Sequence, residues 1–225
     1  MNQATHLSPF VAWPADRTLL LASQSPRRAE LLQLAGLPYA IEPPGDVEAA
    51  LSARLIAAGT GPAPYALALA RAKAADVAAR RPGHLVLGAD TIVVVDGDVL
   101  EKPRDQADAA QLLARLSGRR HTVITAIALC STGPGPGSPN GQGAIDLAVA
   151  ESTDVEFLPL SAAAIERYIA TGEPMDKAGA YGIQGYGAMM VRRVEGCYFN
   201  VMGLPLARLG QLLGQVLGGP SGGMS

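Results

Sequence analysis

Hydrophobic positions along the chain form short apolar runs and longer amphipathic stretches. Runs rich in β-branched and aliphatic residues predict buried or half-buried strands over Thr18–Ala22, His84–Leu87, Thr91–Val95 and His121–Cys130. Asp96-Gly97 is typical of a tight turn, and the pattern around Glu195-Gly196 predicts a hairpin.

Helices are predicted where apolar residues recur at helical spacing or where alanine and leucine dominate. The first has Ser25 as its N-cap, Pro26 at its first position and Gly36 behind its end. The others cover Glu48–Ala58 (the weakest), Pro64–Arg81, Asp105–Ser117, Ser161–Thr171 and Leu206–Leu217. Because helices and strands mix without strict alternation, the sequence predicts an α/β fold with a mixed twisted sheet flanked by helices.

The predicted domain organisation is simple. Residues 1–17 are expected to form a loose N-terminal extension, 18–217 a single domain, and 218–225 a disordered tail. The Gly/Pro-rich segment 131–143 lies between two predicted strands, so it is expected to be a long loop rather than a linker between domains.

Composition narrows the class of function. With 48% hydrophobic and 17% charged residues, the chain is typical of a globular protein. A net charge of −2 and 4% aromatic residues argue against nucleic acid as a partner and leave a small anion as the better ligand. The lone cysteines, the lack of a membrane-length apolar run and the absence of a signal-peptide pattern predict a cytoplasmic protein with no membrane partner.

Residues Ser23–Arg28 form the first candidate site. A helix that begins near Pro26 places Arg27 and Arg28 in its first turn, beside free backbone amides and the positive end of the helix dipole. This combination suits a phosphate group. Two solvated surface arginines are the alternative.

Asp90, in the segment GADT, follows a predicted buried strand. A carboxylate at the end of such a strand can bind a divalent cation or accept a proton from an attacking water. The alternative, favoured for this residue alone, is an Asp that caps or turns the chain locally.

Lys73 lies on an apolar stripe of the alanine-rich helix, and Lys102 precedes Pro103 after the next strands. Either ammonium could simply extend to solvent. Taken together with Arg27 and Asp90, they form a plausible phosphate cradle that is not a P-loop, because the sequence lacks GK[ST].

The segment from Met175 to Gly187 combines closely spaced glycines with Lys177 and Gln184. Glycines allow backbone to approach a ligand closely, and the Gln184 amide offers both a donor and an acceptor to a base edge. A flexible surface loop is the alternative.

These segments, in this order, resemble the Maf family of nucleotide pyrophosphatases from about Leu20 to Leu209. The matching motifs are LASQSPRRAELL, ARAKA, GADTIVVVDGDVLEKPRD, LSGRRHTVITAIAL, GEPMDKAGAYGIQGYGA and VMGLPL. The resemblance implies a fold with two lobes around a central cleft, often as a homodimer. It also implies hydrolysis of a nucleoside triphosphate to the monophosphate and pyrophosphate.

The resemblance also assigns roles. Arg27, Thr91 and Gln184 match the branch that acts on dTTP and UTP. Asp90, Lys73 and Lys102 are the expected catalytic residues, and the expected substrate-binding residues are Ser23, Arg27, Arg28, Thr91, Lys177 and Gln184. Asp90 and Glu48 are the expected ligands of a divalent cation (Mg²⁺, Mn²⁺ or Co²⁺). Ala49 departs from the family, which often has a second acidic residue there.

Two other functions remain open at this point. One is a pyrophosphatase with another preference, either for modified pyrimidine nucleotides or, as in the sister branch, for 7-methyl-GTP. The other is a non-catalytic regulator of cell division that binds nucleotide without turnover.

Overall fold

The computed structural model describes residues 8–15, 17–133 and 143–217. The predicted tail (218–225) and most of the Gly/Pro-rich segment lie outside these residues. The described residues form a mixed sheet in the order β2-β1-β3-β5-β6-β7, with β4 paired to β3. Its strands are β1 (Leu19–Ala22), β2 (Tyr39–Ile41), β3 (Val86–Val95), β4 (Asp98–Leu100), β5 (Arg120–Ser131), β6 (Ile145–Phe157) and β7 (Val191–Glu195).

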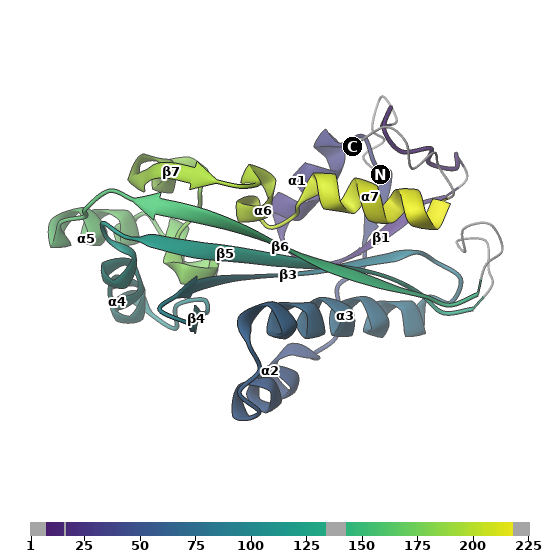
Figure 1. Ribbon diagram of the computed structural model, residues 1–225, viewed down its shortest axis with the longest axis horizontal. Helices are drawn as coiled ribbons and strands as arrows, with labels where there is room; N and C mark the ends of the chain where they lie inside the picture. The colour runs from purple at the N-terminus through teal and green to yellow at the C-terminus, as the bar shows by residue number, and fades with distance from the viewer. Residues whose placement is uncertain (1–7, 16, 134–142, 218–225) are drawn as a thin grey trace.

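Helices cover both faces of this sheet. The α-helices are α1 (Pro26–Leu34), α2 (Glu48–Ala57), α3 (Pro62–Arg80), α4 (Gln106–Leu116), α5 (Ala162–Ala170), α6 (Tyr198–Met202) and α7 (Leu206–Leu217). The 3₁₀ turns are η2 (Glu173–Asp176), η3 (Ala178–Ala180) and η4 (Gly185–Met190). In Figure 1, α3 runs along one face, α1 and α7 lie on the other, and α4 and α5 gather at one end.

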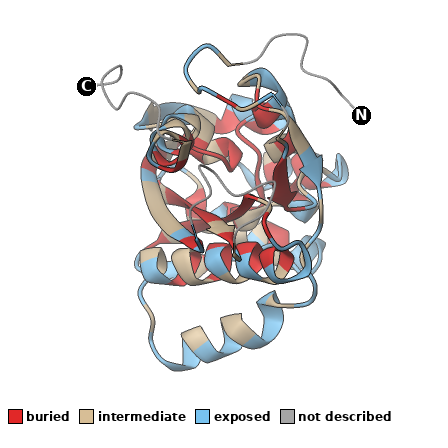
Figure 2. Ribbon diagram, turned by 90° about the vertical axis from the view of Figure 1, so that its right-hand side faces the viewer, coloured by how far each residue is buried: buried red, intermediate tan, exposed pale blue. Residues whose placement is uncertain are grey.

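The hydrophobic core follows this layering. One cluster joins α1 and α7 to β1 and the first half of β3, and a second packs α3 against the opposite face. A third joins α4, α5 and the second half of β3 at the far end. Figure 2 shows buried residues lining the interior between the helices and the sheet, whereas α2 projects below α3 and has no buried residue. The predicted mixed α/β fold is confirmed.

The direction of the strands changes at β3. β1 pairs in parallel with both β2 and β3, and the β3–β5, β5–β6 and β6–β7 pairs are antiparallel. β1 ends opposite Gly88, whereas β3 continues to Val95. This step leaves an opening in the sheet beyond the end of β1, where a side chain from β3 is free to face a cavity.

Several local expectations need correction. β3 is a single strand through GADT, so Asp90 lies inside it and not at its end. Glu195-Gly196 is no hairpin, because β7 ends there and the chain continues into α6. The described part of the N-terminal extension is not loose, since the Trp13 indole is 8% exposed and belongs to the core beside α1 and α7.

Three further observations concern the Gly/Pro-rich segment, the cysteines and the helices. β5 and β6 pair directly through Ser131 and Ile145, so the Gly/Pro-rich segment joins two adjacent strands. Both cysteines, Cys130 and Cys197, are free thiols. In the part of the chain that the structure describes, every helix is too short or too polar to cross a membrane.

Candidate active site

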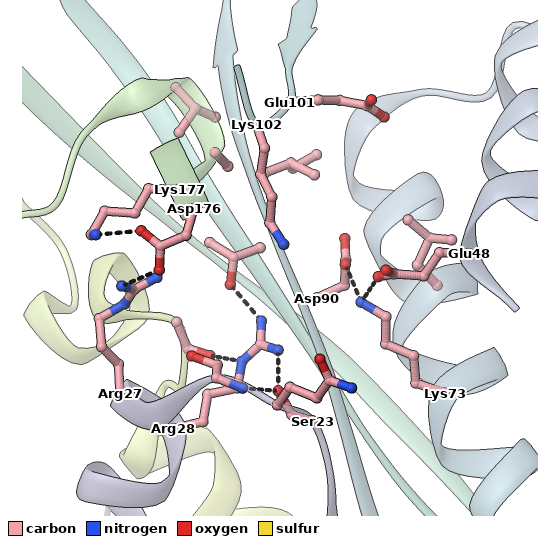
Figure 3. A pocket seen from close by; sticks show the side chains of 18 of the residues that line it. Ser23, Arg27, Arg28, Glu48, Lys73, Asp90, Glu101, Lys102, Asp176 and Lys177 are labelled. Atoms are coloured by element: carbon pink, nitrogen blue, oxygen red, sulfur yellow. Dashed lines mark hydrogen bonds and ion pairs between the residues drawn. The ribbon is translucent and has the colours of Figure 1, made fainter. Parts of the chain in front are cut away.

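A cavity of about 750 Å³ opens beyond the end of β1, lined by residues of α1, α2, α3 and β3 and of the segment 176–184. The side chains predicted from sequence as site residues all line it: Ser23, Arg27, Arg28, Glu48, Lys73, Asp90, Thr91, Lys102, Lys177 and Gln184. Figure 3 shows most of them converging on one space from separate elements.

Asp90 and Lys73 form the buried pair of this cavity. Lys73 Nζ donates to Asp90 Oδ1 over 2.8 Å, and the two side chains are 9% and 11% exposed. Lys73 also forms an ion pair with Glu48, whose side chain is 52% exposed. Lys73 therefore does not extend to solvent, and Asp90 is not a turn residue. One ammonium holds two carboxylates at the cavity wall.

The charge of Glu48 is set by its neighbours. Burial raises the pKa of this carboxyl, but Lys73, Lys102 and Arg28 outweigh that effect, so the pKa of Glu48 lies below its ordinary value. Glu48 is therefore ionised at neutral pH and faces the cavity as a carboxylate.

Gly88 explains how α3 comes close enough to make this pair. A Cβ at Gly88 would collide with the Ala70 carbonyl oxygen and lie 2.7 Å from Ala74 N and 2.9 Å from Ala74 Cβ. Glycine on the strand and alanine on the helix thus allow an unusually close approach of two backbones. Lys73, next to Ala74 on the same helix, is brought to Asp90 by this contact.

Arg28 is held by three elements rather than solvated. Its guanidinium donates from Nε to the Gly203 carbonyl over 2.9 Å, from Nη1 to Ser23 Oγ over 2.9 Å and from Nη2 to Thr91 Oγ1 over 3.1 Å. Burial lowers the pKa of Arg28, while Asp90 and Glu48 act in the opposite direction. An arginine has five N–H groups, so two remain for a ligand.

Asp176 is a site residue that the sequence reading missed. Its carboxylate accepts from Lys177 Nζ over 2.6 Å and from Arg27 Nη1 over 3.4 Å. It thereby joins α1 to a segment 149 residues away. The acidic neighbour of Lys177 was visible in the sequence, but nothing local indicated that Arg27 would share it.

Lys102 differs from the other cations. It forms no hydrogen bond or ion pair with any residue that the structure describes. In Figure 3 its ammonium points into the space between Asp90 and Arg28. It is therefore the cation most readily available to an incoming anion.

Glu173 and Tyr168 fix the loop that carries Gln184, and neither was predicted. Glu173 accepts from the backbone N–H groups of Tyr186 over 3.0 Å and Gly187 over 3.1 Å, and from the Tyr168 hydroxyl over 2.8 Å. The Tyr168 oxygen in turn accepts from Gly182 N over 3.2 Å. Anchors on both sides of Gln184 make this loop ordered, contrary to the alternative of a flexible surface loop.

A polar cluster forms the rim of the cavity beneath α2. The Tyr65 hydroxyl lies 2.7 Å from Ser52 Oγ and donates to Glu101 Oε1 over 2.7 Å. Burial and the nearby Glu101 carboxylate raise the pKa of Tyr65 to about 12, so the phenol keeps its proton. This cluster ties α2 and α3 to the segment after β4, which carries Lys102.

Possible metal ligands are limited to oxygen donors. No group of three or more His, Cys, Asp or Glu side chains suited to a metal occurs among residues 8–15, 17–133 and 143–217. Ala49 lines the cavity, but its methyl group cannot bind a metal ion. Asp90 and Glu48 each use one carboxylate oxygen for Lys73, so each retains a second oxygen.

The chain is similar to known proteins over most of its length. Residues 18–216 match the family model described as Maf-like protein. The chain is 49% identical over 197 residues to the dTTP/UTP pyrophosphatase of Symbiobacterium thermophilum, covering 88% of this chain and 93% of that protein. It is 43% identical over 192 residues to the dTTP/UTP pyrophosphatase of Bacillus velezensis, covering 85% and 93%. With a match over nearly the whole domain, the chain belongs to the Maf family.

Proposed function

We propose that this protein is a nucleoside triphosphate pyrophosphatase that hydrolyses dTTP and UTP to the nucleoside monophosphate and pyrophosphate. The activity named for its relatives supports this, and the cavity offers the groups that such a reaction uses. The observation that carries the proposal is the buried Asp90 carboxylate, fixed by Lys73 in a cavity whose lining includes the cations Arg27, Arg28, Lys102 and Lys177.

In this reaction Asp90 acts as the general base. Asp90 orients a water molecule against the α-phosphorus and takes its proton as the new P–O bond forms. The bond from the α-phosphorus to the oxygen bridging to the β-phosphate breaks, and pyrophosphate leaves with that oxygen. The proton on Asp90 then returns to solvent.

Cations stabilise the charge that moves onto the leaving pyrophosphate. Lys102 points into the cavity, in the space between Asp90 and Arg28. Arg27 and Lys177 are held by Asp176 and become available to phosphate oxygens as these compete with that carboxylate. Fixed positive charge at the developing negative charge is commonly the largest contribution to phosphoryl-transfer catalysis.

A divalent cation fits this site with few protein ligands. Asp90 and Glu48 would hold it through the oxygens that Lys73 does not use. Mg²⁺ in nucleotide enzymes is typically bound by one or two carboxylates, with water and substrate phosphates completing its shell. When bound, such an ion would neutralise phosphate charge and orient the triphosphate.

The loop that carries Gln184, together with Thr91, would read the pyrimidine base. Gln184 lines the cavity, and its neighbours are anchored by Glu173 and Tyr168. The two free cysteines support a cytoplasmic location. The family resemblance supports a homodimer, and sedimentation equilibrium measures the oligomeric state directly.

The test is a panel of nucleotides assayed for released pyrophosphate with Mg²⁺, Mn²⁺ and Co²⁺. We expect dTTP and UTP to be the best substrates. Preference for 7-methyl-GTP would contradict the branch, and nucleotide binding without turnover under every metal would contradict catalysis.

A matched pair of variants tests the catalytic centre. Asp90→Asn keeps the side-chain shape and should lower kcat by at least about 100-fold. Asp146→Asn changes an exposed carboxylate whose side chain, among the residues that the structure describes, binds only Arg71, and it should leave kcat unchanged. Near wild-type turnover by Asp90→Asn would refute the role of Asp90.

A further inference from the structure

A buried hydrogen-bond network lies directly behind the cavity wall. Asn200, on α6, is 0% exposed, and its amide is fully paired. Asn200 Oδ1 accepts from Thr125 N over 3.0 Å, and Nδ2 donates to the Val123 carbonyl over 2.9 Å and to Thr153 Oγ1 over 3.0 Å. Because backbone N–H groups only donate and carbonyls only accept, these partners fix the orientation of the amide.

The Thr125 hydroxyl, also 0% exposed, continues the network toward the cavity. Thr125 Oγ1 lies 2.8 Å from the backbone carbonyl oxygen of Asn200 and 3.0 Å from Thr91 Oγ1. The carbonyl has no proton, so the single Thr125 proton points toward it. The Thr91 hydroxyl must therefore donate its own proton to Thr125.

This direction decides what Thr91 offers to a ligand. Its proton points away from the cavity, and one lone pair already accepts from Arg28 Nη2 over 3.1 Å. Toward the cavity the hydroxyl retains only a lone pair, so it acts as an acceptor. An ionised phosphate oxygen is itself an acceptor and cannot form a hydrogen bond with this lone pair, whereas an N–H group of a ligand can donate to it.

Arg28 supplies the complementary donor beside it. The guanidinium is fixed by Gly203, Ser23 and Thr91, and the second N–H of Nη2 is on the nitrogen that binds the Thr91 oxygen. The Arg28 N–H donor and the Thr91 oxygen acceptor lie side by side. They match a carbonyl oxygen beside an N–H group, which is the arrangement at the imide edge of thymine and uracil. Cytosine has an unprotonated N3 at this edge and places an acceptor against an acceptor.

We propose that Thr125 and Asn200 are positioning residues that hold the Thr91 hydroxyl as an acceptor and so select imide-bearing pyrimidines over cytosine. This inference rests on the proposed function, since it concerns which pyrimidine triphosphate that site accepts. Neither residue reaches the cavity, so both act through Thr91.

The experiment compares kcat/KM for dTTP and dCTP in Thr125→Val, Thr125→Ser and wild-type protein. Valine has nearly the shape of threonine but no hydroxyl, which frees the Thr91 proton to point into the cavity. We expect the dTTP-to-dCTP ratio to fall about tenfold in Thr125→Val, mainly through a higher KM for dTTP, and to stay within about twofold of wild type in Thr125→Ser. If Thr125→Val does not fold, Thr125→Ala gives the same readout.

Thr122→Val is the control, because this hydroxyl on the same strand binds Asp154 away from the cavity. A loss of activity that is equal for both nucleotides in Thr125→Val would indicate a purely structural role and overturn the inference. The two proposals fail separately. Wild-type protein that releases no pyrophosphate from dTTP or UTP refutes the proposed function, whereas an unchanged ratio in Thr125→Val refutes only the positioning by Thr125.

Discussion

Gly88→Ala tests whether the contact between β3 and α3 creates the catalytic pair. The added methyl would overlap the Ala70 carbonyl and approach Ala74 N to 2.7 Å, so the two backbones must separate. Overpacking of this kind typically costs about 1–3 kcal/mol of unfolding free energy, and we expect the upper end because backbone atoms cannot rotate away. A shift of Lys73 by about 1 Å would lower kcat by about 100-fold.

Chemical denaturation and pyrophosphate release measure these two effects independently. The double variant Gly88→Ala/Ala74→Gly removes the Ala74 Cβ contact at 2.9 Å but leaves both backbone contacts, so it should not recover activity. Wild-type stability and turnover in Gly88→Ala would refute the reasoning, and full recovery in the double variant would assign the effect to the Ala74 methyl alone.

Three further predictions concern the charged and buried groups. Lys73→Met leaves the two carboxylates without their shared ammonium, and we expect a loss of about 3 kcal/mol in urea unfolding, the low end for a broken buried pair because Glu48 is half exposed. An unchanged midpoint would contradict this. Glu173→Gln weakens the anchors of the Gln184 loop and should raise the KM for dTTP about tenfold with little change in the unfolding midpoint; an unaltered KM would show that these anchors are dispensable. Burial lowers the pKa of His121 to about 4. Between about pH 6.5 and 4 the unfolded chain therefore binds more protons than the folded protein. Above about pH 6.5 His121 is neutral in both states and does not change the free energy of unfolding. As the pH falls toward 4, the free energy of unfolding decreases by up to about 3 kcal/mol. Denaturation across this range should show the slope, and His121→Gln should lack it.

Some features of the molecule follow from short stretches of sequence. α1 begins at Pro26 as predicted, and the Asp105 side chain caps α4 by accepting from Asp108 N over 2.8 Å. Asp96 and Gly97 adopt positive φ angles of 56° and 86° in the predicted turn. Periodicity, caps and turns depend on residues a few positions apart, so the sequence displays them directly.

Predictions from sequence were wrong where a structural feature depends on residues far apart in the chain. The predicted strand before Asp90 is in fact continuous through it, and the strand that ends there is β1. Apolar runs do not reveal where a neighbouring strand stops. The solvated alternative for Lys73 was reasonable for a lysine on a helix, but it is wrong because Asp90 and Glu48 lie opposite.

The sequence by itself therefore determined most of the helices and the longer strands, the mixed α/β class and, through its ordered motifs, the family and many of the residues that line the cavity. Only the tertiary structure decided which of those residues are paired. It brought Asp176 to Arg27, Lys73 to Asp90 and the Thr125 hydroxyl to Thr91. The physical reason is that a hydrogen bond or ion pair depends on side-chain separations of about 3 Å, and these are fixed by how strands and helices pack and not by the spacing of residues along the chain.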